Sequence, residues 1–198
     1  MKTLRYLLLG SLATLLMAAD CSNKDSEFYN DVFVNSPELV TIDNAAPHLA
    51  GDPVMVSAEL PRALYEAGQT GALDLYRTTG GATAFTFSYL IEKETGANQW
   101  TPIDISENLV LTEDGNALAY GDFLLAQAVY DAASETYLYR GGIRMAQTGN
   151  YRLRFTYNQE PSGAIVLTSD SAAGNLFVTI FSSCAQTDAS GYYYFTVN

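Results

Sequence analysis

The segment Tyr151–Asn158, YRLRFTYN, most constrains the fold of this chain, because apolar and polar residues alternate in it without a break. Successive side chains of a β-strand point to opposite faces of a sheet, so strict alternation predicts a strand with one buried and one wet face. The same pattern recurs in Phe85–Glu92 and in Val54–Leu60. The side chains predicted to face inward in these two strands are Phe85, Phe87, Tyr89, Ile91, Val54, Val56, Ala58 and Leu60.

Short apolar runs separated by turn residues extend this pattern over most of the chain. Asp114-Gly115 favours a tight hairpin turn, because glycine accepts positive φ angles, and turns at Thr95–Asn98 and Ser134–Thr136 separate two further pairs of runs. Antiparallel strands at these intervals predict a sandwich or barrel forming one domain over residues 31–198. The other predicted strands are Ala72–Arg77, Leu109–Thr112, Thr136–Met145, Ala164–Ser169, Leu176–Ser182 and Tyr192–Val197.

Two segments carry helical signals. Pro61–Ala67 has a proline in its first turn and is followed by Gly68, which predicts a short helix. Phe123–Ala133 is rich in helix-forming residues, but its apolar residues also fit period two, and we predict a strand there.

The segment Met145–Phe155, MAQTGNYRLRF, places a glycine two residues before Tyr151, which opens the alternating strand. This arrangement resembles the tyrosine corner of immunoglobulin-like sandwiches, whose tyrosine hydroxyl binds upstream backbone. The resemblance implies an all-β, antiparallel immunoglobulin-like β-sandwich. Leu153 would then stand where an antibody domain has the second cysteine of its intersheet disulfide.

The N-terminus carries a targeting signal. Lys2 and Arg5 precede an uncharged apolar run, Tyr6–Ala19, which is typical of a secretory signal peptide over residues 1–20. A comfortable membrane span needs roughly 20 apolar residues, so this run is too short to be one.

The end of this signal resembles the lipobox of bacterial lipoproteins, on the residues Ala18, Ala19 and Cys21. Asp20 departs from the pattern, since lipoproteins usually carry Gly, Ala or Ser at that position. The resemblance implies cleavage before Cys21, acylation of that cysteine by a fatty acid such as palmitate, and a lipid anchor in the outer membrane. The domain would be periplasmic or surface-exposed.

Residues 21–30 form a polar tether, read either as the acidic tether of surface-displayed lipoproteins or as an ordinary solvated linker. Cys184 is the only other cysteine of the chain. If Cys21 carries lipid, Cys184 is a lone thiol, expected to be buried at a strand end. If Cys21 is not acylated, the two cysteines can form a disulfide in the oxidising envelope.

Charge and motifs exclude several kinds of activity. A formal net charge of −12 repels phosphate backbones, so we expect no nucleic-acid partner. His48, the single histidine, is interpreted as an ordinary surface or turn residue, and the sequence lacks zinc, P-loop and G-x-S-x-G signatures. We therefore predict no metal, no cofactor and no catalytic residue.

Five acidic residues gather in the segment DISENLVLTEDGNALAYGD. Paired carboxylates serve glycosidases, and carboxylates in loops bind calcium, but no D-x-D-x-D-G loop or fixed spacing supports either site, and we interpret the run as solvated acidic turns. The five residues are Asp104, Glu107, Glu113, Asp114 and Asp122.

Aromatic residues are the main candidates for ligand contact, because sugar-binding modules stack rings on exposed tyrosine or tryptophan. Alternation in Tyr192–Val197 sends Tyr192 and Tyr194 to one face and Tyr193 to the other, and Trp100 follows a predicted hairpin turn, where we expect it to close the turn. The sequence favours a non-enzymatic interaction or accessory module of an envelope complex, such as an uptake or secretion assembly. A surface carbohydrate-binding module and a glycosidase are the alternatives. The full set of candidate aromatics is Tyr65, Tyr76, Trp100, Tyr120, Tyr192, Tyr193 and Tyr194.

Overall fold

The alternating segments of the sequence form β-strands. The computed structural model describes residues 30–43, 47–66, 68–157, 160–161, 164–170 and 176–198, so the predicted signal peptide and nearly all of the tether, including Cys21, lie outside the described residues. The strands are β1 (Asn30–Asn35), β2 (Val40–Ile42), β3 (Pro53–Pro61), β4 (Ala63–Leu64), β5 (Leu73–Asp74), β6 (Ala84–Gly96), β7 (Gln99–Pro102), β8 (Val110–Asp114), β9 (Asn116–Tyr120), β10 (Phe123–Asp131), β11 (Thr136–Arg144), β12 (Gly149–Tyr157), β13 (Glu160–Pro161), β14 (Ile165–Ser169), β15 (Leu176–Ser182) and β16 (Tyr192–Val197). The part of the chain that the structure describes also contains the helical turn α2 (Leu75–Thr78) and the 3-10 turn η2 (Glu107–Leu109).

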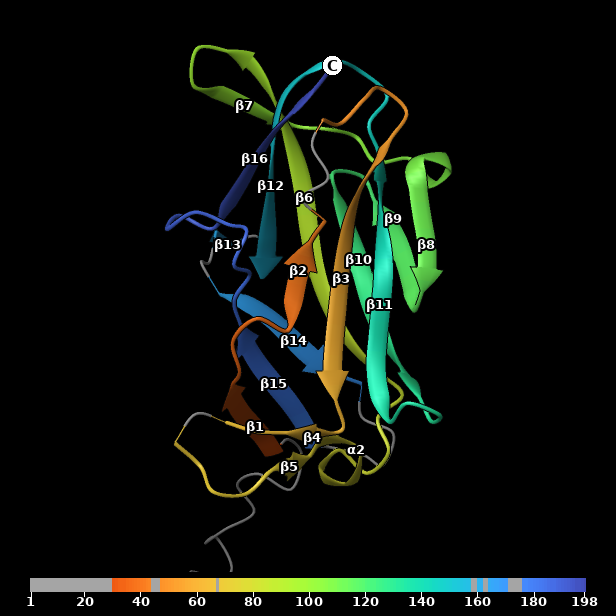
Figure 1. The fold of residues 1–198 in the computed structure, drawn as a ribbon, viewed down its shortest axis with the longest axis vertical. Coiled ribbons are helices and arrows are strands. Elements are labelled where there is room, and N and C mark those ends of the chain that lie inside the picture. Colours follow the sequence, from red (N-terminus) through yellow and green to blue (C-terminus); the bar gives the residue numbers. More distant parts are fainter. Residues whose placement is uncertain (1–29, 44–46, 67, 158–159, 162–163, 171–175) are drawn as a thin grey trace, which may run out of the picture. The chain divides into compact units, whose positions relative to one another are not determined.

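These strands form an antiparallel, all-β, sandwich-like fold, as the sequence predicts. The main path of the large sheet runs β1-β15-β14-β6-β10-β11-β3-β2, and β12, β16, β7, β8 and β9 branch from it. The long strand β6 pairs with β10 and β14 along its first half and with β12 and β7 along its second half. It therefore joins two neighbouring groups of strands (Figure 1).

The sheet folds over on itself around an aromatic core. Phe85 of β6 meets Tyr137 of β11 edge-on at 4.8 Å, although β10 lies between these strands in the sheet. The hydroxyls of Tyr89 and Tyr139 are hydrogen-bonded at 3.0 Å across the same layers. Burial raises the pKa of Tyr139 to about 12 and holds that of Tyr89 well above its usual value, so this buried pair stays protonated.

The backbone hydrogen bond that the resemblance to a tyrosine corner predicts for Tyr151 is present. The hydroxyl of Tyr151 donates a hydrogen bond to the backbone oxygen of Gln147 at 2.9 Å. Leu153, two residues further along β12, is fully buried in the apolar core.

Two local predictions are wrong because side chains or neighbouring strands engage the backbone. Ala72–Arg77 is not a strand beyond β5: the carboxylate of Asp74 accepts a hydrogen bond from the backbone N–H of Arg77 and caps the helical turn α2. Pro61–Ala67 is not a helix, because the backbone N–H of Arg62 donates to Glu135 and the chain continues extended into β4. Ala67 itself lies outside the described residues.

The predicted hairpin at Asp114-Gly115 is also only half right. Gly115 has a φ of 73°, as a turn glycine should. The strands that flank it do not pair with each other, because β8 pairs with β11 and β9 with β10. β10 and β11 pair with each other only over Val129–Asp131 and Thr136–Leu138. Beyond these residues the two strands separate, and β8 and β9 lie between them. By contrast, the strand predicted for Phe123–Ala133, the turn at Ser134–Thr136 and the pairing of β7 with β6 are confirmed.

The thiol of Cys184 and the imidazole of His48 both lie in buried residues. Cys184 is a free thiol buried just beyond β15, the position expected for it if Cys21 carries lipid, and burial raises its pKa. His48 is not a surface residue: its ring meets Phe195 edge-on at 5.3 Å, and its Nε2 has no hydrogen-bond partner. Among the described residues, no helix is long and apolar enough to span a bilayer.

Candidate functional site

The candidate site lies on the outer face of the four strands β7, β6, β12 and β16. Their pairing aligns outward-facing residues in rows across the strands. One row runs Thr196, Asn150, Glu94 and Trp100, and the next runs Tyr194, Arg152, Glu92 and Pro102. Residues nearly one hundred positions apart in the chain thereby become neighbours.

Alternation assigns the faces of β16 as the sequence predicts. Tyr193, Phe195 and Val197 are buried in the core, and Tyr194 on the opposite face is 51% exposed. Tyr192 is half-buried on the same outer face. Tyr192 and Tyr194 therefore lie on the outer face, beside Arg154 and Arg152 of β12.

Trp100 does not close its hairpin turn, because its indole lies across the face toward β12 and β16. Its ring meets Tyr194 edge-on at 5.6 Å, with 71° between the ring planes. Tyr192 and Tyr194 are 6.0 Å apart and inclined by 46°. The three predicted contact aromatics thus form one cluster of tilted rings rather than a flat platform, and two of them, Trp100 and Tyr194, also line a groove.

Arg152 holds this cluster together. Its guanidinium carbon lies 4.7 Å from the ring centre of Trp100 and 4.1 Å from that of Tyr192, within cation–π range of both. Its Nε donates to Glu92 at 2.5 Å. Although burial lowers the pKa of Arg152, its interactions with Glu92 and Tyr194 raise that pKa above its usual value, so the side chain stays charged.

A buried carboxylate underlies this arrangement. The side chain of Glu92 is 8% exposed and also lies 3.8 Å from the Nε of Arg154. Two nitrogens of Arg154, Nε and Nη1, are buried without a hydrogen-bond partner. One buried carboxylate therefore faces two guanidinium groups.

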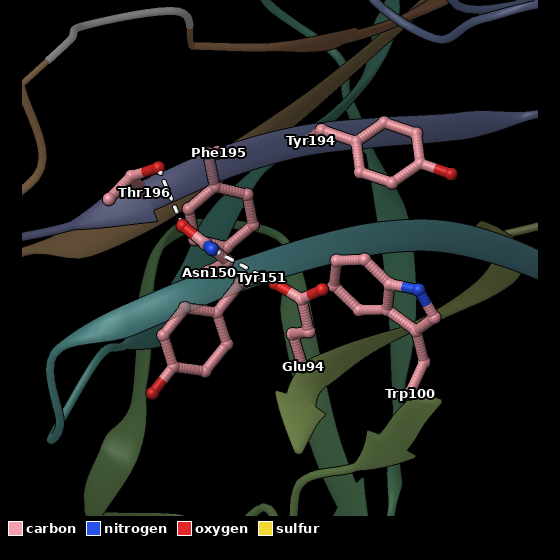
Figure 2. Close-up of a pocket in the computed structure, with 7 residues that line it drawn as sticks. All are labelled: Glu94, Trp100, Asn150, Tyr151, Tyr194, Phe195 and Thr196. Atoms are coloured by element: carbon pink, nitrogen blue, oxygen red, sulfur yellow. Dashed lines mark hydrogen bonds between the residues drawn. The ribbon is translucent and has the colours of Figure 1, made fainter. Parts of the chain in front are cut away.

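Beside the aromatic cluster lies a shallow groove with a volume of about 290 Å³. Along its floor, Thr196 Oγ1 donates to Asn150 Oδ1 at 3.1 Å, and Asn150 Nδ2 donates to Glu94 Oε2 at 2.9 Å (Figure 2). The other residues that line it are Trp100, Tyr151, Tyr194 and Phe195. The groove thus offers ring surfaces next to an ordered amide, hydroxyl and carboxylate, a combination suited to binding a ligand with apolar and hydroxylated faces.

The other predicted candidates lie elsewhere. Tyr76 stacks on Tyr130 at 4.7 Å, Tyr120 stacks on Phe123 at 5.5 Å, and Tyr65 is exposed. The acidic run follows η2, β8 and β9, where Glu113 pairs with Arg140. The described residues contain no group of three or more His, Cys, Asp or Glu placed to hold a metal ion.

Sequence reasoning missed Arg152, Glu92 and the polar row. Arg152 and Arg154 stand out as the wet face of the alternating segment, but the packing of Arg152 against two aromatic rings depends on strand pairing. Comparison with protein-family models, curated proteins and solved structures finds no match for this chain.

Proposed function

We propose that this chain is a non-catalytic lipoprotein of the bacterial outer membrane, anchored through Cys21, that serves as an interaction module of a cell-surface complex such as an uptake or secretion assembly. The signal peptide and lipobox-like residues support the address. One observation carries the binding role: Trp100, Tyr192 and Tyr194 converge with Arg152 on one accessible face, beside the groove. Aromatic residues and arginine dominate the binding energy of most protein interfaces.

Removal of the exposed ring of Tyr194 tests this role. We expect Tyr194→Ala to reduce the partner proteins recovered with the full-length lipoprotein from solubilised envelopes about tenfold, because a central aromatic anchor is lost. Quantitative mass spectrometry of the co-purified proteins measures the effect, and the mass of the N-terminal fragment reports the lipid on Cys21.

Tyr65→Ala is the matched control, since Tyr65 is 69% exposed and does not line the groove. Both variants should keep the thermal stability of the native protein. Equal recovery of partners with the two variants would remove the groove from the proposal. An unmodified Cys21 would remove the anchor.

Binding of a glycan is the second candidate function, favoured by the row of hydrogen bonds along the groove floor. Trp100 is the only tryptophan of the chain, so its fluorescence reports this groove alone. If a glycan is the ligand, a soluble surface polysaccharide should change that fluorescence in a saturable way, and Tyr194→Ala should weaken binding about 10- to 30-fold. Unchanged fluorescence across a panel of neutral and acidic polysaccharides would exclude this candidate.

A further inference from the structure

A second surface of the molecule presents unpaired strand edges. β8 pairs with β11 and β9 pairs with β10, and no ladder joins β8 to β9 in this part of the described chain. Because β10 and β11 are themselves paired, β8 and β9 lie between them, and their free edges face each other. The cleft between these edges is closed at Gly115, which joins the two strands. The cleft has a volume of about 500 Å³.

The residues that line the cleft show that it runs along the backbone edge of β9. Four consecutive residues of β9 line it: Ala117, Leu118, Ala119 and Tyr120. Successive side chains of a strand point to opposite faces, so a cavity that touches all four lies along the edge of the strand. Val110 at the start of β8 and Glu107 line the other side. Alternate N–H and C=O groups of an unpaired edge are available for another strand.

Apolar side chains flank this edge on the outer face. Leu118 is 49% exposed and Tyr120 is 51% exposed, and Tyr120 stacks on Phe123 with 15° between the ring planes. An added strand would cover these side chains as well as satisfy the backbone. Apolar surface beside a free edge is the usual arrangement of sites that bind a peptide by strand addition.

The charge around the open end selects the occupant. Asp104, Glu107 and Asp122 are exposed there, and the backbone N–H of Ile105 donates to Gly121 at 2.6 Å, which ties their two loops together. None of the three takes part in an ion pair with the described residues. Electrostatic complementarity therefore favours a positively charged ligand on this acidic protein.

We infer that the cleft between β8 and β9 binds an extended segment of a partner protein in which apolar and basic residues alternate. The segment pairs with the free edge of β9, places its apolar side chains against Leu118 and Tyr120, and directs its basic side chains toward Glu107 and its neighbours. This site is separate from the groove at Trp100, so the two can be tested independently.

A blocked peptide of alternating valine and lysine is the probe, added to the purified full-length protein. We expect saturable binding and amide hydrogen exchange slowed about tenfold or more in the fragment containing Ala117–Tyr120, because new backbone hydrogen bonds protect these amides. The same peptide with N-methyl groups on alternate amides should bind about tenfold more weakly or worse, since it cannot donate those bonds. Trp100 fluorescence should not change, because Trp100 does not line the cleft.

Charge reversal tests the choice of partner. Glu107→Lys should weaken binding of the valine–lysine peptide about three- to tenfold. Glu59→Lys, the same change on the exposed face of β3, should not. Equal binding of the N-methylated peptide, or of a valine–glutamate peptide, overturns the inference. So does a dimer in sedimentation that Leu118→Lys converts to a monomer, because a second copy of the chain would then occupy the cleft.

Discussion

Gly115→Ala is expected to lower the free energy of unfolding by about 3 to 5 kcal/mol. A Cβ atom on Gly115 would lie 2.3 Å from the backbone oxygen of Gln127 and 2.8 Å from that of Leu138, and neither can move without shifting β10 or β11. The positive φ of 73° adds the strain that any L-residue has in this conformation. Urea denaturation of the two proteins measures the difference.

Gly121→Ala is the matched control, because Gly121 has a φ of 64° but nothing within 4 Å of its Cβ position. It should cost only about 1 kcal/mol, the conformational part of the effect. Equal losses for the two variants would contradict the close approach of Gly115 to both β10 and β11. Gly115→Ala should also abolish peptide binding between β8 and β9, because the closed end of that cleft depends on the close approach of Gly115 to β10 and β11.

This glycine also marks the limit of sequence-based reasoning. The Asp114-Gly115 pair predicts the positive φ, which is a local property, but it cannot show that β8 and β9 pair with other strands. The alternation of apolar and polar residues in β3, β6, β12 and β16 predicts their buried faces, because one face of each strand packs against the core. The capping of α2 by Asp74 overrides the strand signal of Ala72–Arg77 through a single side-chain hydrogen bond.

The candidate site follows the same division. Period two places Tyr192 and Tyr194 on the outer face of β16, and a turn places Trp100 on β7. Their convergence depends on the registers of β6, β12 and β16, which are set by long-range pairing and by packing of the core. The sequence could not predict the role of Arg152 for that reason, because any solvent-facing arginine of a strand shows the same alternating pattern.

Glu92→Gln should be the second most damaging substitution, with an expected loss of about 2 to 4 kcal/mol in the free energy of unfolding. The amide keeps the shape of the side chain but removes the charge that balances Arg152 and Arg154, whose side chains are only 17% and 18% exposed. A buried charge without its partner costs more than the pair contributes. Glu59→Gln, on an exposed site, should change stability by less than about 0.5 kcal/mol.

A triple variant separates stability from binding at this cluster. Glu92→Leu, Arg152→Met and Arg154→Leu together replace the ions by apolar side chains, and we expect the stability to return to within about 1 kcal/mol of the native protein. Loss of Arg152 removes the cation between Trp100 and Tyr192. Although it is stable, the triple variant should therefore fail to recover the partner proteins from solubilised envelopes. A triple variant that is stable and binds normally would show that these charges serve neither the groove nor the fold.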